Sequence, residues 1–247
     1  MSDRYDPTAY GASIAEEYDS LWEGLVDTDA AVACLAALAG EGPVLELGVG
    51  TGRLALPLVE RGLSVHGVDA SEAMLDQLRA KPGGDTLTVT VGDFADVEVP
   101  GPFSLVVLAL NTIFALPTQD AQVACFANAA RHLGPGGRFV IETWVPDLNR
   151  FSASGSAVDV RRLTPTAVSI DVAELDPLAQ RMRTTQVSLR DGHLRLHPAN
   201  HRYAWPAELD LMARLAGMRC EHRWADWARS PFTAASPAHV SVYRRPE

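Results

Sequence analysis

Acidic residues and glycines stand at the ends of apolar runs in this sequence, a placement that suits ligand binding. The first such run, residues 43–47, carries Glu46 and is followed by glycines at alternate positions, Gly48, Gly50 and Gly52. Glycine lets the backbone turn sharply and approach a ligand closely, because it has no Cβ. A helical pattern begins at once, and the free N–H groups of a helix start favour a negative or electron-rich group. The stretch therefore predicts a buried parallel strand, a tight turn and a helix that bind a ligand together.

The glycine spacing separates this loop from two other ligand-binding loops. A dinucleotide fingerprint has the spacing G-x-G-x-x-G, and counting from Gly48 its last position falls on Arg53. A phosphate-binding P-loop ends in Gly-Lys-Ser/Thr, and this stretch has no lysine. An NAD-dependent dehydrogenase is therefore disfavoured, while a glycine turn without any ligand remains the alternative for this stretch taken alone.

Two further acidic residues follow the next predicted strands. Asp69 ends the run 63–69, where a carboxylate can accept two hydrogen bonds from a ribose diol, as suits NAD and adenosylmethionine alike. Asp93 follows the run 87–91 and precedes Phe94. Its carboxylate can accept a hydrogen bond from the amino group of adenine, and the neighbouring ring or backbone can hold the edge and face of the base. Because ligands of open α/β sheets bind at the carboxyl ends of the strands, these residues predict an adenosine site.

The order and spacing of these features between residues 43 and 138 match one family. This part of the chain resembles the class I S-adenosylmethionine-dependent methyltransferases, and the turn Gly134–Gly137 before a predicted strand is another hallmark of that family. The predicted fold is α/β: a Rossmann-like seven-stranded, mainly parallel sheet with helices on both faces and an antiparallel β cap inserted after strand five. The cofactor that the resemblance implies is S-adenosyl-L-methionine.

The resemblance also implies which residues bind this cofactor. They belong to the glycine loop, to the ends of the second, third and fourth strands, and to one helix, and they are Glu46, Gly48, Gly50, Gly52, Arg53, Asp69, Ala70, Met74, Gly92, Asp93, Phe94, Leu110 and Asn111.

Four residues are implied to surround the methyl group that is transferred: Asn111, Phe114, Tyr10 and Tyr18. Asn111 can offer a carbonyl oxygen to the cationic sulfonium or to a substrate amine, and Phe114 can form a wall of the transfer site. Tyr10 and Tyr18 belong to an N-terminal segment whose predicted helix, residues 12–22, would lie over the cofactor as a lid. For Phe114 and the tyrosines, plain packing against the core is the alternative.

The pattern of predicted elements divides the chain into four segments. They are an N-terminal helical lid segment (1–40), a cofactor-binding core (41–144), an antiparallel substrate cap (145–205), and a C-terminal helix with strands that complete the core sheet (206–247). Within the cap, Asp191-Gly192 is a hairpin signal that sets Leu189 opposite Leu194 on an apolar face. The cap is also the surface through which a homo-oligomer would form.

Composition and charge argue against several classes of protein. The net charge of −10 argues against a general nucleic-acid surface, and the apolar run 30–39 is too short to span a bilayer. Three scattered cysteines and a polar start without a signal peptide predict a cytoplasmic protein with reduced thiols. His193, His197 and His201 are spaced by four, but no carboxylate or cysteine neighbour completes a metal site. We therefore predict no metal, nucleic-acid or membrane partner.

The predicted function is transfer of a methyl group from S-adenosyl-L-methionine to a small molecule. The chain is similar to bacterial N-methyltransferases that tailor natural products, which favours an amine nitrogen as the acceptor. An amine, once deprotonated by solvent, needs no protein base, whereas a hydroxyl does. The alternatives are a small-molecule O-methyltransferase with a histidine base and a non-catalytic adenosylmethionine-binding protein.

Overall fold

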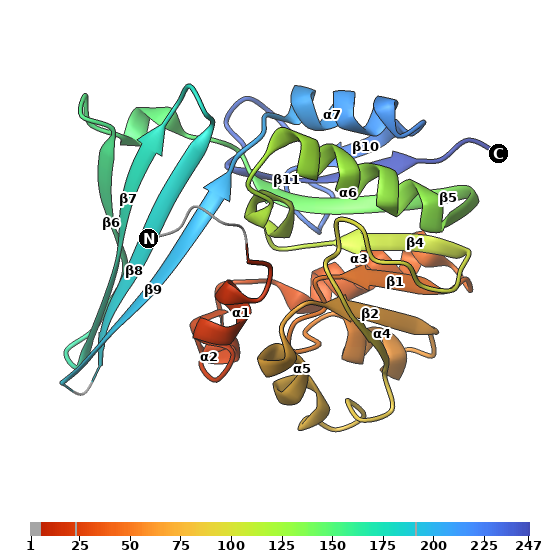
Figure 1. Cartoon of the computed structure of the whole chain (residues 1–247), viewed down its shortest axis with the longest axis horizontal. Coiled ribbons are helices and arrows are strands. Elements are labelled where there is room, and N and C mark those ends of the chain that lie inside the picture. Colours follow the sequence, from red (N-terminus) through yellow and green to blue (C-terminus); the bar gives the residue numbers. More distant parts are fainter. Residues whose placement is uncertain (1–5, 23, 191) are drawn as a thin grey trace.

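The computed structural model of the chain describes residues 6–22, 24–190 and 192–247. Residues 1–5, the polar start of the chain, and Asp191 of the predicted hairpin turn lie outside the described residues. Figure 1 shows two sheets side by side: a central sheet with helices around it and a separate sheet of long strands.

The central sheet has seven strands in the order β10-β11-β5-β4-β1-β2-β3. Parallel pairing joins β3, β2, β1, β4 and β5, whereas β11 runs antiparallel to both β5 and β10. The fold predicted from the sequence is confirmed, including the two C-terminal strands that return to this sheet. The strands are β1 (Val44–Leu47), β2 (Val65–Asp69), β3 (Thr88–Val91), β4 (Phe103–Leu108), β5 (Leu133–Trp144), β10 (Arg219–Trp224) and β11 (Ala238–Arg244).

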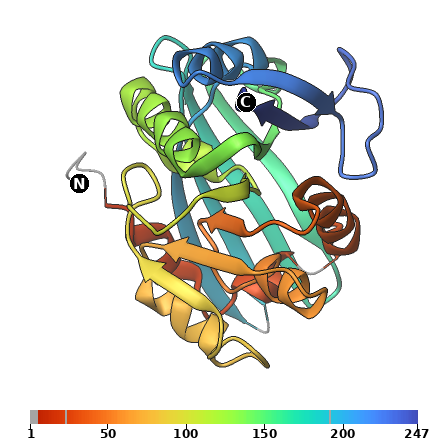
Figure 2. The same cartoon turned by 90° about the vertical axis from the view of Figure 1, so that its right-hand side faces the viewer.

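Helices cover both faces of this sheet, as Figure 2 shows. Two clusters of buried side chains lie on its two sides, one beneath α3, α4 and α5 and the other beneath α6 and α7. The middle strands are covered on both faces, so every residue of β1 is buried, including Glu46. The helices are α3 (Thr28–Ala39), α4 (Ala55–Glu60), α5 (Glu72–Arg79), α6 (Gln119–His132) and α7 (Pro206–Leu215), with short 3-10 turns η1 (Thr112–Ala115) and η2 (Leu148–Arg150).

The second sheet is the predicted cap, inserted between β5 and α7. It consists of β6 (Ser156–Leu163), β7 (Ala167–Asp176), β8 (Arg181–Arg190) and β9 (His193–Arg202), in that order and all antiparallel. Leu189 pairs with Leu194 and Val187 with Leu196, so the predicted hairpin register is confirmed. Because paired residues share a face, the strands carry one apolar and one polar face.

The polar face of the cap points inward, towards the rest of the chain. The buried residues within β6–β8 and the first part of β9 all lie on that face: Ala157, Asp171, Ala173, Met182 and His197. The opposite face exposes its valines and leucines to solvent. The usual arrangement of an antiparallel sheet, apolar side in and polar side out, is therefore reversed here.

The N-terminal segment differs in detail from the prediction. The helix expected over residues 12–22 is two short helices, α1 (Ala9–Ile14) and α2 (Tyr18–Trp22), separated by a turn in which the Glu17 N–H donates to the Ile14 carbonyl. The break lets α1 pack against Met74 of α5 while α2 lies at the glycine loop. No helix in the described part of the chain is both long and apolar enough to cross a membrane.

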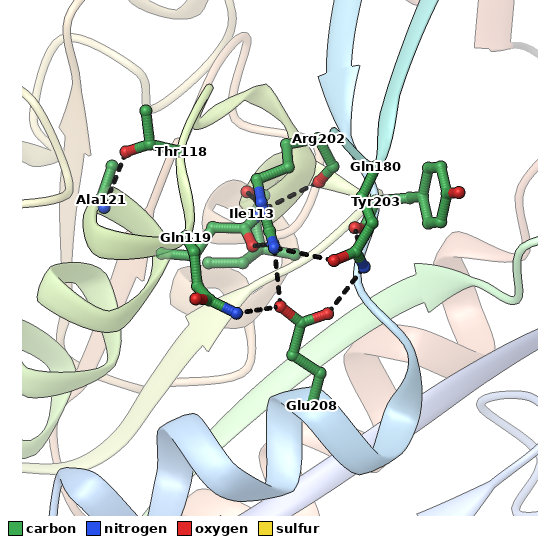
Figure 3. Close-up of polar contacts among 9 residues, drawn as sticks. Ile113, Thr118, Gln119, Ala121, Gln180, Arg202, Tyr203 and Glu208 are labelled. Atoms are coloured by element: carbon green, nitrogen blue, oxygen red, sulfur yellow. Dashed lines mark hydrogen bonds and ion pairs between the residues drawn. The ribbon is translucent and has the colours of Figure 1, made fainter. Parts of the chain in front are cut away.

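A buried polar cluster joins the cap to the core (Figure 3). Arg202, at the end of β9, donates to Glu208 at 2.7 Å, to Gln122 at 2.6 Å and to Gln180 at 3.1 Å. Gln119 and Gln180 also donate to Glu208. These side chains come from α6, α7, β9 and the β7–β8 turn, so the cluster fixes the cap at its base.

Candidate functional site

The parallel strands bring the predicted motif residues to one edge of the central sheet. The carboxyl ends of β1, β2 and β4 are neighbours, because these strands are adjacent and run in the same direction. A small cavity lies at this edge, and its lining comes from the lid, the glycine loop and the end of β4: Tyr18, Glu46, Gly48, Val49, Gly50, Thr51, Arg53, Ala109, Leu110 and Thr112.

The glycine loop needs its glycines for two reasons. Gly48, Gly50 and Gly52 all have positive φ angles, of 70°, 54° and 81°, which other residues rarely adopt. A Cβ on Gly48 would come within 2.9 Å of Thr112. Asp69 holds the loop, since its Oδ2 accepts the Gly50 N–H at 2.8 Å. The loop is therefore a preformed concave backbone with Asp69 at its side.

Glu46 is the most unusual group in the cavity. It is 5% exposed, and its Oε2 has no hydrogen-bond partner among the described residues. Burial raises the pKa of Glu46 to about 8; the Arg53 guanidinium opposes this shift and the Asp69 carboxylate adds to it. A buried carboxyl oxygen without a partner is costly, so this atom is available to a cationic ligand group.

We expect Glu46→Gln to make the free protein more stable than wild type above pH 8. The carboxyl has a folded-state pKa of about 8, above the ordinary value of 4.5, so its ionisation removes stability as the pH rises through this window. Glutamine carries no charge to bury, and the stability difference should grow to a few kcal/mol at alkaline pH. Urea unfolding of both proteins at pH 6 and pH 9 measures it, and parallel pH curves would contradict the assignment.

The end of β4 is held in an unusual backbone conformation. Leu110 and Asn111 have φ angles of 51° and 64°, although neither is glycine. Glu142 of β5 stabilises both, because its Oε2 accepts the Leu110 N–H at 2.9 Å and its carbonyl accepts the Asn111 N–H at 2.9 Å. The Asn111 side-chain oxygen accepts a hydrogen bond from the backbone N–H of Trp144 at 2.6 Å. The sequence predicts that the Asn111 oxygen faces the sulfonium or the acceptor amine. In the structure, one lone pair of this oxygen is used to hold the loop against β5.

Glu142 and Trp227 are positioning residues that the sequence analysis did not identify. The Trp227 indole N–H donates to Glu142 Oε1 at 2.6 Å and ties the loop after β10 to the wall of the cavity. The only local signal for this role is an acidic residue inside the apolar strand β5. Its partners are distant in sequence, so no local pattern could identify them.

The predicted lid, represented here by α2, contacts the glycine loop beside the cavity. The Thr51 hydroxyl donates to Asp19 Oδ1 at 2.6 Å, and Lys81 Nζ lies 2.6 Å from Asp19 Oδ2 and donates to the Thr51 carbonyl at 2.8 Å. Tyr18, next in the chain, lines the cavity, and burial raises the pKa of its phenol. The cavity measures about 30 Å³, far below the roughly 300 Å³ of the smallest usual ligand pockets. That the N-terminal segment acts as a lid over the cofactor stays a prediction.

Other predicted site residues lie around this cavity without lining it. Met74 is covered by α1, and Phe94 and Phe114 are buried in the core cluster beneath α6 and α7. Phe114 packs edge-on against Trp144, with ring centroids 4.7 Å apart. Asp93 accepts the Ala95 N–H at 2.9 Å. Contact of these residues with the cofactor stays a prediction.

The remaining predicted residues differ in their accessibility. Tyr10 is 40% exposed on α1, outside the lining of the cavity. Ala70 and Gly92 follow β2 and β3 directly, as the sequence predicts, and the Gly92 N–H donates to the Asp69 carbonyl at 3.0 Å. Their roles, like that of Tyr10, stay predictions.

Comparisons with known proteins show to which family the chain belongs. Residues 44–137 match the model of a methyltransferase domain. The chain is 30% identical to the cypemycin N-terminal methyltransferase of a Streptomyces species, over 97% of this chain and 99% of that one. The chain belongs to the S-adenosylmethionine-dependent methyltransferases.

Solved structures agree with this assignment. The CcbJ methyltransferase from Streptomyces caelestis is 44% identical and superimposes with a TM-score of 0.89, over 98% of this chain and 100% of that one. An S-adenosylmethionine-dependent methyltransferase from Clostridium acetobutylicum shares the fold at 15% identity, with a TM-score of 0.80 over 96% and 99% of the two chains.

The site of this methyltransferase fits S-adenosyl-L-methionine. When bound, the cofactor supplies an electrophilic methyl group on a sulfonium. Glu46, with its partnerless buried oxygen, suits the ammonium of the methionine part, and Arg53 suits its carboxylate. Asp69 lies where a ribose diol can be bound at the end of β2. Tyr18 lines the same cavity, and its role beside the transferred methyl group stays a prediction.

Proposed function

We propose that this methyltransferase methylates an amine nitrogen of a natural product or of a precursor of one. The full-length likeness to a methyltransferase named for the N-terminus of cypemycin supports this proposal most directly. The chemistry of the site agrees with it, because no histidine lines the cavity among the described residues. A neutral amine attacks a sulfonium methyl group without a protein base, whereas an alkyl hydroxyl needs one.

Labelled cofactor tests this proposal. The full chain, incubated with methyl-labelled S-adenosylmethionine, should transfer label to members of a panel of primary and secondary amines and not to matched alcohols. The initial rate should rise with pH towards the pKa of each amine, because only the neutral amine attacks. Transfer to alcohols, lost in His197→Gln or His201→Gln with a profile pKa near 6.5, would make an O-methyltransferase with a histidine base the better assignment.

We also propose that two copies of the chain associate through the outer face of the cap. This face carries Val158, Val160, Leu163, Leu194 and Leu196, each between 58% and 76% exposed. Four strands about 4.8 Å apart, with eight residues of about 3.3 Å each, span roughly 500 Å². Monomers seldom expose apolar patches of more than a few hundred Å², and the residues around this face would supply the rest of the about 800 Å² that each partner of a stable dimer buries.

We expect Val160→Glu to convert the dimer into a monomer. The substitution places a charge in the middle of the apolar face, where a second copy would have to desolvate it. Light scattering coupled to gel filtration measures the mass of the particle. Leu178→Glu is the matched control, because Leu178 is 96% exposed in the β7–β8 turn, away from the face. A wild-type protein that is monomeric at every concentration would refute the proposal.

Finally, we place the protein in the cytoplasm. Cys34, Cys125 and Cys220 are free thiols, and the first two are buried. Unpaired cysteines suit a reducing compartment. Fractionation of the producing cell tests this placement.

A further inference from the structure

His197 is a buried polar side chain whose hydrogen-bonding groups are not used. It lies on the inner face of the cap and is 8% exposed. Both of its ring nitrogens are buried, and neither has a hydrogen-bond partner among the residues that the structure describes. An unpaired buried polar group costs free energy, so native proteins rarely keep one without a role. His193, on the same strand and the same face, is exposed and provides a comparison.

Glu17 of the lid faces this histidine. Its Oε2 lies 3.6 Å from His197 Nε2, too far for a direct hydrogen bond, while its Oε1 forms an ion pair with Arg195. Glu17 directly precedes Tyr18, which lines the cofactor cavity. The pair therefore joins the predicted lid to the cap, one residue before the Tyr18 of the cavity lining.

The neighbouring rung of the inner face carries small side chains. Ala173, Thr184 and Ala199 pair across β7, β8 and β9 next to the rung of His197. Beyond these small side chains lies His201, whose Nδ1 also lacks a partner among the described residues. Two imidazoles with unused nitrogens thus flank a row of small residues.

We propose that Glu17 and His197 bind a hydroxyl group of the methyl acceptor. An oxygen about 2.8 Å from both atoms bridges their 3.6 Å separation: the hydroxyl donates to Glu17 Oε2 and accepts the Nε2–H of His197. The proposal rests on the proposed function, and it adds that the acceptor is an amino alcohol whose hydroxyl contacts the cap while its nitrogen faces the cofactor.

The charges around the pair favour a neutral hydroxyl over an ion. Arg195 already balances the charge of Glu17, and Arg161 lies 2.5 Å from Asp171 on the same face of the cap. A carboxylate would be repelled by Glu17, and a second cation would compete with Arg195. A hydroxyl both donates and accepts, which matches a carboxylate oxygen beside an imidazole N–H.

A pair of small amines tests the proposal in the full-length protein saturated with adenosylhomocysteine. Binding of trans-2-aminocyclohexanol and of cyclohexylamine, which lacks the hydroxyl, is measured by calorimetry and by shifts of ¹⁵N-histidine resonances. We expect the amino alcohol to bind about tenfold more tightly, since one of the bonds is to a charged group, and to shift the His197 signals.

Substitutions at two positions of the strand β9 separate a binding role from a structural one. In His197→Phe the preference for the amino alcohol should disappear, while the affinity for adenosylhomocysteine and the melting temperature stay near wild type. His197→Gln serves if the phenylalanine variant does not fold, and His193→Gln is the matched control that should keep the preference.

Several results would overturn the proposal that Glu17 and His197 bind a hydroxyl group. They are equal binding of the two amines, binding of neither, or a preference that survives in both His197 variants. Failure of the wild-type protein to bind adenosylhomocysteine would instead count against the proposed function. The two proposals can therefore fail separately.

Discussion

Asp69→Ala is expected to weaken the binding of adenosylhomocysteine by tenfold or more. We propose that the carboxylate accepts two hydrogen bonds from the ribose diol, each of which contributes about 1.5–3 kcal/mol when one partner is charged. Asp69 also orders the site before the ligand arrives, because it accepts the Gly50 N–H at 2.8 Å and the Ser71 N–H at 2.9 Å. Titration calorimetry measures the affinity directly.

The control for this experiment is a second acidic residue outside the site. Asp85 is exposed in the loop before β3, so Asp85→Ala should leave the affinity unchanged. Asp69→Asn isolates the charge, since asparagine keeps the shape and one oxygen acceptor, and its loss should be smaller than that of alanine. Unchanged affinity in a folded Asp69→Ala protein would show that this side chain only shapes the glycine loop.

The features predicted well from the sequence depend on neighbours in the chain. The glycine loop and Asp69 each follow a short apolar run, and the strands of a parallel sheet place such residues at one edge. The cap register followed from the Asp191-Gly192 signal, because a two-residue loop fixes which residues pair. Leu189 lies opposite Leu194 as expected.

The direction in which the cap faces could not be predicted in this way. Alternation in β8 and β9 shows that two faces exist, but which one points inward depends on what lies against it. Glu17 and the edge of the lid are polar, so they meet His197 and Arg195. Val160 and Leu196 are left in solvent. Contacts with the rest of the fold therefore decide which face of the cap points inward. Hydrophobicity alone predicts that the apolar face would do so.

Contacts between distant segments account for the other differences. Glu142 is bound to Trp227 and to Leu110, and Asp19 is bound to Lys81 across the glycine loop. Each pair joins residues whose separation in the sequence carries no regular spacing. The fold alone brings them together, so they become visible only in the structure.

Arg202→Met is expected to reduce the free energy of unfolding by about 2–4 kcal/mol, because it leaves a half-buried carboxylate without its cation. Arg202 and Glu208 have side chains that are 7% and 16% exposed, and their ion pair measures 2.7 Å. The variant also removes the donors to Gln122 and Gln180, whose oxygens would then stay buried. Urea denaturation of the full chain measures the change.

Arg183→Met is the matched control, because Arg183 pairs with Glu174 on the exposed part of the cap, with side chains 74% and 62% exposed. Such a surface pair contributes about 0–1 kcal/mol. Adding Glu208→Gln to Arg202→Met removes the buried charge and should restore part of the lost stability. Equal losses in the Arg202 and Arg183 variants would contradict the role of the cluster.

The pH dependence gives an independent test of the same cluster. Burial raises the pKa of Glu208, but hydrogen bonds from Gln180, Arg202 and Gln119 outweigh it, so this pKa lies below its usual 4.5. A group with a lowered folded-state pKa contributes stability above its unfolded pKa and loses it as the pH falls through the folded one. The stability difference between wild type and Arg202→Met should therefore be full at pH 7 and shrink below pH 4.5.

Because Gln122 also donates to the Ile113 carbonyl of η1 and to the Arg202 carbonyl, the variant should release the base of the cap and raise KM for the acceptor more than Kd for the cofactor.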